Sequence, residues 1–278
     1  MKNLLFIVDP QFDFMGWANG QPYVWNGGQA ALPVAGAVED MTRLAHYIET
    51  SITEIDGIIV TLDTHELPGS GPDIGHPSFW MDKAGKAPAP FTMVTLSDVL
   101  NGVWTPRDSS LLPRVRAYLE KVEAQQVWTR HCVDGTQGQQ VFGRLALALK
   151  FWESNTHHQV KYVRKGMNPL TEQYGVFEAA VPDLADPSTQ FNEELLREIE
   201  SYSQVFVAGE ALDFCVKTSI EQMVPKLPPE ALTRFTLLSD SMSPVNLDGK
   251  NTVGNAFLSK MRQLGMQVSS TDQIMLAA

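Results

Sequence analysis

Five short apolar runs in this chain each end at, or just before, a residue whose side chain can react or bind a metal. The runs end near positions 8, 62, 128, 164 and 209, and the residues concerned are Asp9, Asp63 with His65, His131, Lys165 and Cys215. In an open parallel α/β sheet the carboxyl ends of the strands lie along one edge, where ligands bind. We therefore expect an acid, a lysine, a thiol and a set of metal ligands to meet in one pocket.

Strand-like and helix-like patterns alternate along the 278 residues, as in chains built from repeated parallel crossover units. Apolar residues recur at helical spacing from Val38 to Ile52 and from Leu111 to Val122. We expect further helices at 139–153, 192–201, 214–224 and 251–264, and further strands near 160–165, 204–209 and 235–240. This order predicts the α/β class.

The stretch from Glu66 to Arg107 is irregular and rich in glycine and proline, and it is too long for an idle connection in a compact domain. It contains four large aromatic residues, Phe79, Trp80, Phe91 and Trp104, too many for a freely solvated linker. We expect one domain, residues 1–278, with a long insertion at about 66–127. Part of the insertion is predicted to fold over the pocket mouth. One alternative is a subunit contact, since we expect the protein to be a homo-oligomer. The other is a local satellite core.

The composition favours a small-molecule partner. A formal net charge of −11 argues against nucleic acid, because affinity for a phosphate backbone rests on clustered Lys and Arg. No apolar run approaches the roughly 20 residues that span a bilayer, and the first residues lack the parts of a signal peptide. Two cysteines do not make a disulfide framework, so we expect free thiols, a cytoplasmic location and no membrane partner.

Cys215 is the candidate nucleophile. It follows an apolar strand and a short turn, near the start of an expected helix, where unpaired N–H groups and the helix dipole favour the thiolate. The same N–H groups can form an oxyanion hole. The alternative is a small buried hydrophobic side chain, which is our interpretation of Cys132 because it has no strand-to-helix turn.

Asp9 and Lys165 acquire a role only together with Cys215. Alone, Asp9-Pro10 is a turn signal, and Lys165-Gly166 is an ordinary exit from a strand. Beside a thiol, however, a carboxylate can take its proton and later deliver it to a departing amine, while an ammonium holds both anions.

The candidate metal ligands are Asp63, His65 and His131. Residues two apart in an extended segment point the same way, so Asp63 and His65 can bind one ion and a third ligand can come from another strand end. This O/N donor set suits Zn²⁺, Fe²⁺ or Mn²⁺, and the sequence does not choose among them. His76 is a candidate fourth ligand.

Taken in order, these segments resemble the isochorismatase-like cysteine hydrolases, and within that family the nicotinamidases or pyrazinamidases. The segment from Asp9 to Phe14 looks like the family's opening Asp-x-Gln-x-Asp-Phe, and Asp63-Thr64-His65 is similar to its Asp-x-His motif. The other similar segments are 128–136, which contains His131-Cys132-Val133, 165–169, and the nucleophile segment 209–216.

The resemblance implies a three-layer α/β/α fold with a central, mostly parallel doubly wound sheet, and hydrolysis of a heteroaromatic carboxamide to an acid and ammonia. It implies that Cys215 attacks the amide carbon, Asp9 moves the proton and Lys165 supports both. Further implied features are an oxyanion hole at the N–H groups of Ala211 and Cys215, a cis peptide before Ala211, a metal ion that binds the ring nitrogen, and ring packing by Phe14 and Trp128.

Two features depart from the family pattern. Glu210 stands where many members have an apolar residue, and Leu212 where a small hydroxyl residue is common. Three functions therefore stay open: a metal-dependent nicotinamidase-like amidase, a relative acting on another small amide or a vinyl ether, and a non-catalytic binder of similar metabolites.

Overall fold

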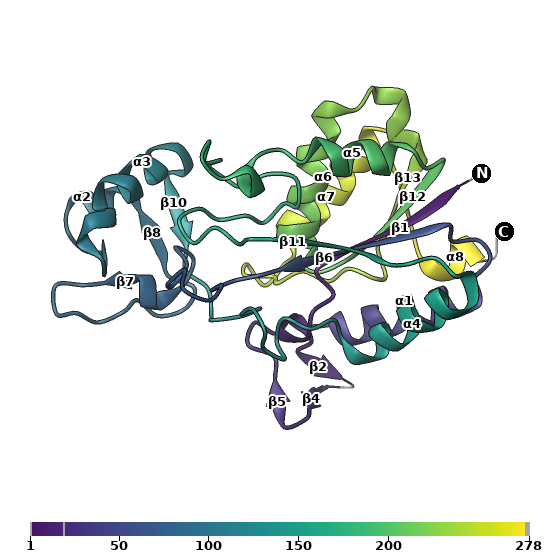
Figure 1. The fold of residues 1–278 in the computed structure, drawn as a ribbon, viewed down its shortest axis with the longest axis horizontal. Helices are drawn as coiled ribbons and strands as arrows, with labels where there is room; N and C mark the ends of the chain where they lie inside the picture. The colour runs from purple at the N-terminus through teal and green to yellow at the C-terminus, as the bar shows by residue number, and fades with distance from the viewer. Residues whose placement is uncertain (1, 19, 276–278) are drawn as a thin grey trace.

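A six-stranded sheet forms the centre of the computed structural model, which describes residues 2–18 and 20–275 (Figure 1). Every neighbouring pair of strands in this sheet is parallel. In spatial order the strands are β11 (Lys161–Lys165), β6 (Gly57–Asp63), β1 (Asn3–Val8), β12 (Gln204–Gly209), β13 (Phe235–Leu238) and β14 (Gln267–Ser269).

Helices cover both faces of the sheet because the residues of each buried strand alternate between the two faces. In β1, Leu5 and Ile7 pack with α1 (Ala37–Thr50) and α4 (Gly143–Thr156). The intervening Leu4, Phe6 and Val8 pack in a second core cluster with α5 (Glu193–Glu200), α6 (Lys217–Met223) and α7 (Thr252–Gln263). The predicted three-layer α/β/α fold with a parallel doubly wound sheet is confirmed.

The remaining elements are short. Two-stranded sheets pair β2 (Trp17–Ala18) with β3 (Gln21–Pro22), β4 (Val24–Trp25) with β5 (Gly28–Gln29), β7 (Trp80–Met81) with β9 (Thr105–Pro106), and β8 (Met93–Thr95) with β10 (Ala124–Gln126). The other α-helices are α2 (Leu96–Leu100), α3 (Leu112–Val122) and α8 (Thr271–Met275). Single turns of 3-10 helix lie at Phe12–Phe14, Pro77–Phe79, Ser109–Leu111, Pro187–Thr189 and Val224–Lys226, and a longer one at Pro229–Arg234. Within the described residues, no helix is long and apolar enough to span a membrane.

One predicted strand is wrong. The apolar pair Val127-Trp128 was expected to end a strand of the main sheet, but β11 occupies the place beside β6, and the chain before Val127 pairs with β8 instead. Val127 continues that pairing, because its N–H donates to the carbonyl of Thr92 at 2.8 Å. His131 is therefore positioned by a loop rather than by a strand end.

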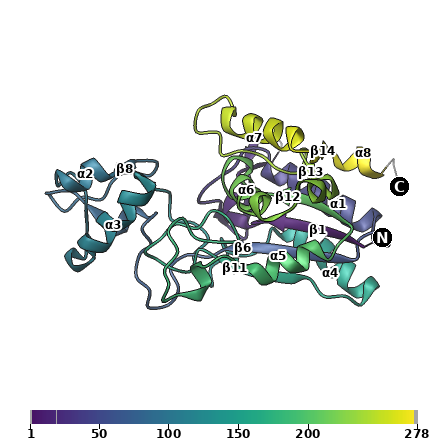
Figure 2. The same cartoon turned by 90° about the horizontal axis from the view of Figure 1, so that it is seen from above.

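The insertion at 66–127 has its own hydrophobic cluster. Elements α2, α3 and β8 lie apart from the central sheet (Figure 2), and their apolar side chains pack around Phe79 and Trp80, which are 3% and 0% exposed. The indole N–H of Trp80 also donates to the carbonyl of Ile74 at 2.7 Å. These two aromatic residues therefore pack in a satellite core, and the expectation that the insertion covers the pocket or a partner subunit stays a prediction.

Candidate active site

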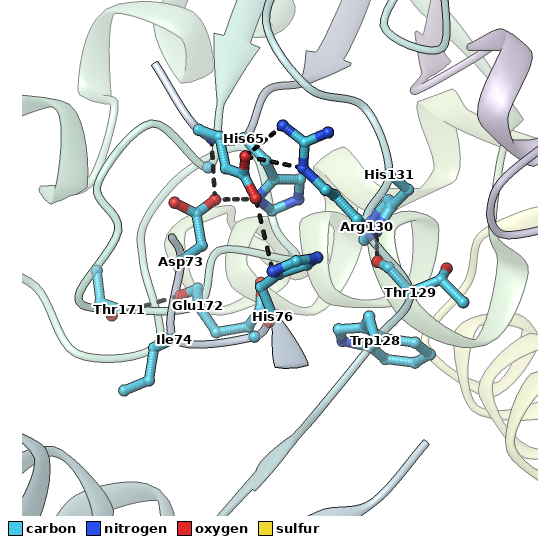
Figure 3. Close-up of a pocket in the computed structure, with 13 residues that line it drawn as sticks. His65, Asp73, Ile74, His76, Trp128, Thr129, Arg130, His131, Thr171 and Glu172 are labelled. Carbon is cyan, nitrogen blue, oxygen red and sulfur yellow. Dashed lines mark hydrogen bonds and ion pairs between the residues drawn. The ribbon is translucent and has the colours of Figure 1, made fainter. Parts of the chain in front are cut away.

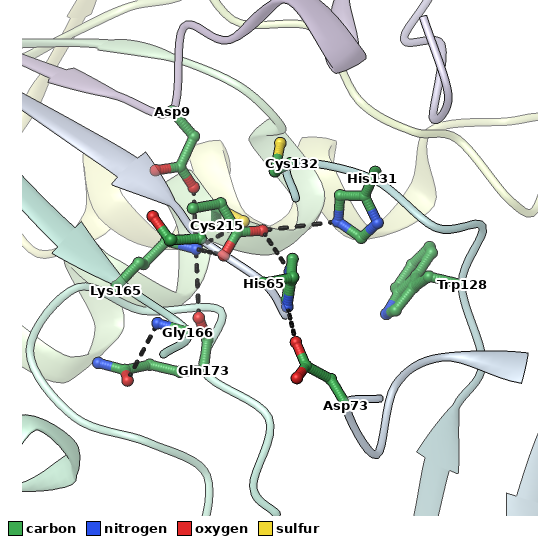
Figure 4. Close-up of polar contacts among 12 residues, drawn as sticks. Asp9, His65, Asp73, Trp128, His131, Cys132, Lys165, Gly166, Gln173 and Cys215 are labelled. Carbon is green, nitrogen blue, oxygen red and sulfur yellow. Dashed lines mark hydrogen bonds and ion pairs between the residues drawn. The ribbon is translucent and has the colours of Figure 1, made fainter. Parts of the chain in front are cut away.

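Asp9, Lys165 and Cys215 lie together at the carboxyl ends of β1, β11 and β12 (Figure 4). The ammonium Nζ of Lys165 lies 2.9 Å from Asp9 Oδ2 and 3.6 Å from Cys215 Sγ. It also donates to the carbonyl of Gln173 at 3.2 Å. Thr61 fixes the carboxylate from the next strand, because its hydroxyl donates to Asp9 Oδ1 at 2.6 Å and accepts the Asp9 N–H at 3.0 Å.

Burial controls the charges of these three residues. It raises the pKa of Asp9 and raises that of the Cys215 thiol well above its ordinary value, although Lys165 opposes both shifts. Burial alone would lower the pKa of Lys165, but the carboxylates of Asp63 and Asp9 outweigh it and raise that pKa well above normal. Burial therefore opposes the thiolate that the start of a helix was expected to favour. The thiol needs a base to remove its proton, and Asp9 is in contact with it.

Cys215 lies on a turn that the sequence describes only in outline. After β12 the chain forms a cis peptide between Glu210 and Ala211, as the family resemblance implied, and then a π-helical turn over Leu212–Val216. The carbonyl of Ala211 accepts the N–H of Val216 at 3.1 Å, which closes this turn. The expected helix at 214–224 therefore begins as a wider turn, and α6 follows it from Lys217.

The candidate metal ligands also meet. One ligand atom from each of Asp63, His65 and His131 lies within 4.8 Å of the others. Asp63 Oδ2 is 3.0 Å from His65 Nε2 and 3.5 Å from His131 Nε2, and Asp63 Oδ1 is 3.1 Å from Lys165 Nζ. Burial opposes the ionisation of Asp63, but the charges of His65 and Lys165 outweigh it and hold the pKa of Asp63 well below its ordinary value. This carboxylate therefore links the candidate metal site to the lysine.

Hydrogen bonds orient both imidazoles with Nε2 toward Asp63. His65 Nδ1 lies 2.6 Å from Asp73 Oδ2, and His131 Nδ1 lies 2.8 Å from the carbonyl oxygen of Thr129. A carboxylate or carbonyl on the far nitrogen is the usual support for a metal-binding histidine. One carboxylate and two such imidazoles form a donor set that fits a divalent transition metal.

A short bridge between two loops brings His131 to this site. The N–H of His65 donates to the carbonyl of Cys132 at 3.0 Å, and the N–H of Asp134 donates to the carbonyl of His65 at 2.9 Å. Cys132 itself is fully buried, and its N–H donates to Asp13 Oδ2 at 2.7 Å. Cys132 is thus a packed structural residue, as predicted.

His76 lies outside the three-residue cluster. Its Nδ1 is 2.7 Å from the hydroxyl of Ser78 and 3.6 Å from Glu66 Oε1, and it lines a cavity beside the cluster (Figure 3). In this arrangement the candidate fourth ligand is held by the insertion, and the donor set consists of three residues.

A narrow cavity lies between the candidate nucleophile and the candidate metal ligands. It is lined by Cys215, by Asp63 and His131, and by the aromatic rings of Phe14 and Trp128. Its free volume is about 20 Å³, room for roughly one water molecule. A ring-shaped ligand would therefore enter only if the walls move.

The adjoining cavity brings the insertion to the site. Trp128 and His131 border both cavities, and the second one is also lined by Glu66 and by residues 73–76 (Figure 3). This first part of the insertion thus borders the pocket, and its Ile74 also belongs to the satellite core.

Sequence reasoning did not identify three residues of the site. Asp73 orients His65, Glu172 borders both cavities, and Tyr174 accepts the indole N–H of Trp128 at 2.9 Å. All three lie in irregular segments, where no periodicity points to a shared surface. Only the concentration of polar residues around Glu172 could have drawn attention to that loop.

Neither a scan against models of known protein families nor a search of curated proteins finds a match for this chain. Solved structures do match it along nearly its whole length. The yeast nicotinamidase shares 20% identity over 96% of this chain and 99% of its own, with a TM-score of 0.57. The zinc complex of the Pyrococcus horikoshii pyrazinamidase shares 20% over 97% and 99%, with a TM-score of 0.53. An isochorismatase-like hydrolase from Alkaliphilus metalliredigens shares 13% over 100% and 99%, also with a TM-score of 0.53.

These likenesses show the fold: the chain has the isochorismatase-like hydrolase fold. The matching structures include nicotinamidases and pyrazinamidases. The resemblance inferred from the ordered sequence motifs is therefore confirmed at the level of the fold.

Proposed function

We propose that this protein is a metal-dependent cysteine amidohydrolase that converts nicotinamide, or a related heteroaromatic carboxamide, to the acid and ammonia. The observation that carries the proposal is the cavity lined by both Cys215 and the metal-ligand candidates Asp63 and His131. A planar substrate between Phe14 and Trp128 can place its amide at the thiol and its ring nitrogen toward the metal ligands. Solved proteins of the same fold support this choice, since one is a yeast nicotinamidase bound to the inhibitor nicotinaldehyde and another is a protein from L. infantum in complex with nicotinate.

The reaction begins with transfer of the Cys215 proton to the carboxylate of Asp9, and the sulfur then forms a bond to the amide carbon. The N–H groups of Ala211 and Cys215 are the proposed donors to the resulting oxyanion. Asp9 next gives its proton to the departing nitrogen, the C–N bond breaks, and ammonia leaves behind a thioester. Water, deprotonated by Asp9, then releases the acid and restores the thiol.

Lys165 supports this cycle by charge. It contacts both Asp9 and Cys215, so it stabilises the pair as the proton moves between them. Asp63, His65 and His131 would hold one zinc, iron or manganese ion, which supplies an anchor and Lewis acid for the substrate ring.

Two other functions remain distinct alternatives. Vinyl-ether hydrolysis does not use a metal, so it gives no reason for the oriented Asp63, His65 and His131 cluster. A non-catalytic binder would be free to lose its acid, lysine or thiol, yet all three are present and in contact.

The direct test is ammonia release from the purified protein incubated with nicotinamide, pyrazinamide, benzamide and aliphatic amides. We expect the heteroaromatic amides to be hydrolysed and benzamide, which lacks a ring nitrogen, to be a poor substrate. Tight binding of nicotinamide without ammonia release would favour the binder. Turnover restricted to aliphatic amides would contradict the proposed role of the ring pocket.

A further inference from the structure

Glu210 is a buried carboxyl group that the proposed reaction does not use. It directly precedes Ala211 and is 0% exposed, and it contacts the carboxyl of Asp40 on α1, which is 3% exposed. Within the described residues, Glu210 Oε1 and Asp40 Oδ2 are buried oxygens without a hydrogen bond of ordinary geometry, and the Ser243 side chain also faces the carboxyl of Asp40. Two carboxylates cannot hydrogen-bond to each other, so this contact requires a proton between them.

The other oxygen of Glu210 ties the nucleophile turn to the loop at 241–246. The N–H of Ser243 donates to Glu210 Oε2 at 3.1 Å, and the carbonyl of Ser243 accepts the N–H of Leu212 at 2.9 Å. Two residues further along, the N–H of Val245 donates to Asp213 Oδ1 at 2.8 Å. The turn and the loop are thus joined on both sides of Ala211.

This loop is a wall of the candidate active site, because Val245 lines the cavity over Cys215. The residue that precedes α1, Gly36, also packs closely against this loop. Gly36 has φ 98°, and a Cβ there would lie 2.4 Å from the hydroxyl oxygen of Ser243. Glu210 therefore lies between α1 and the loop, one residue before a proposed oxyanion donor.

We propose that Glu210 is a positioning residue, which shares one proton with Asp40 and thereby holds the nucleophile turn and the 241–246 loop in the arrangement that catalysis needs. The inference rests on the proposed amidase function for its kinetic consequences. The shared proton itself follows from the contact and is tested without any substrate.

The charges around the pair decide how it responds to pH. Asp213 faces Glu210 from the nucleophile turn, Arg43 pairs with Asp40 from α1, and the loop contributes Ser243 without a charge. Burial raises the pKa of Glu210 well above its ordinary value and that of Asp40 to about 6. Since these pKa values are raised in the folded state, stability falls as the pH rises above the ordinary carboxyl pKa, because the unfolded chain then releases a proton that the folded pair still holds.

The first experiment measures the melting temperature of the whole protein as a function of pH. In Glu210→Gln the amide donates to the Asp40 carboxylate at every pH and still accepts the N–H of Ser243. We expect the difference in melting temperature, Glu210→Gln minus wild type, to increase from about pH 5 to pH 8. Glu49→Gln on the same helix is the matched control. Its ion pair with Arg144 lowers the pKa of Glu49 from the ordinary value of 4.5, so Glu49 stays ionised in the folded and the unfolded chain across this pH range, and the difference between this variant and the wild type should not change with pH.

The second experiment separates positioning from general stability. Glu210→Ala should lower kcat at least about tenfold with little change in KM, because the ring and metal groups are untouched. Glu210→Gln should restore kcat and keep activity at higher pH than the wild type. Hydrogen exchange at the Ser243 amide should be faster in the alanine variant and unchanged in the glutamine variant.

Several results would overturn the inference. A Glu210→Gln melting curve that parallels the wild type across pH would refute the shared proton. Wild-type kcat and wild-type amide exchange in Glu210→Ala would refute the positioning role. If the wild type hydrolyses no amide, the proposed function fails by itself, while the melting and exchange measurements still decide the inference about Glu210. If the alanine variant does not fold, the pH dependence of the glutamine variant still decides it.

Discussion

Replacing Lys165 by methionine would remove a positive charge that contacts both Asp9 and Asp63. The ammonium lies 2.9 Å and 3.1 Å from these carboxylates, and its side chain is 1% exposed. Removing one partner of such a buried pair costs about 3–5 kcal/mol, because it leaves an uncompensated buried charge. For a chain of this size that corresponds to a fall in melting temperature of about 6–20 °C.

The loss should depend on pH. Burial already raises the pKa of Asp9 against the opposing charge of Lys165, so without the lysine that pKa rises further. An acid with a raised folded-state pKa costs stability above its ordinary pKa, so the deficit of Lys165→Met should be small in acid and grow toward neutral pH. Circular dichroism melts at a series of pH values measure this.

Lys161→Met is the matched control, since it removes a lysine from the same strand. Lys161 pairs with Glu198 at the surface, where the two side chains are 41% and 32% exposed. Such exposed pairs contribute about 0–1 kcal/mol. If Lys165→Met were no less stable than Lys161→Met at neutral pH, the reasoning about the buried charge network would be refuted.

Three further predictions concern the metal site and the insertion. Elemental analysis of protein purified without chelators should find one transition-metal ion per chain, and the His65→Ala variant should lose this ion. The metal site would be contradicted if the protein held no metal and its activity did not respond to added Zn²⁺, Fe²⁺ or Mn²⁺. Asp73→Asn should weaken metal affinity about 10- to 100-fold through the orientation of His65, and unchanged affinity by competitive titration would show that this contact is irrelevant. Trp80→Ala should cost about 3–5 kcal/mol within the satellite core without altering KM, and altered KM with wild-type stability would restore a lid role for this residue.

The strand ends of the fold were predictable because buried parallel strands are short apolar runs. Asp9, Asp63 and Lys165 follow from that pattern, since each stands at the end of a strand of the central sheet. His131 was expected beside Asp63 and His65 and does lie there, but for a different reason, because its position depends on a backbone bridge between His65 and Val133. A pairing between residues so far apart in the chain leaves no local signal.

The rest of the site depends on packing that periodicity does not describe. Aromatic residues in a glycine- and proline-rich segment fit a lid, an interface or a core equally well, and the sequence does not show that Trp80 packs in one cluster with residues of α3. The protonation state of the Cys215 thiol also depends on packing. The position of Cys215 at a turn predicts an accessible thiolate, but burial, which the sequence does not show, raises its pKa.

Ammonia release from nicotinamide by the wild type, Cys215→Ala and Cys132→Ala tests the central claim most directly. Loss of a covalent nucleophile should remove several orders of magnitude in rate, whereas Cys132→Ala should keep most of the activity because that thiol packs in the core, where it contacts the carbonyl of Gly138. The account predicts that the wild type releases ammonia and that Cys215→Ala, folded by circular dichroism, does not. A Cys215→Ala protein with more than about a tenth of the wild-type rate, a difference of only about 1.4 kcal/mol, would contradict it.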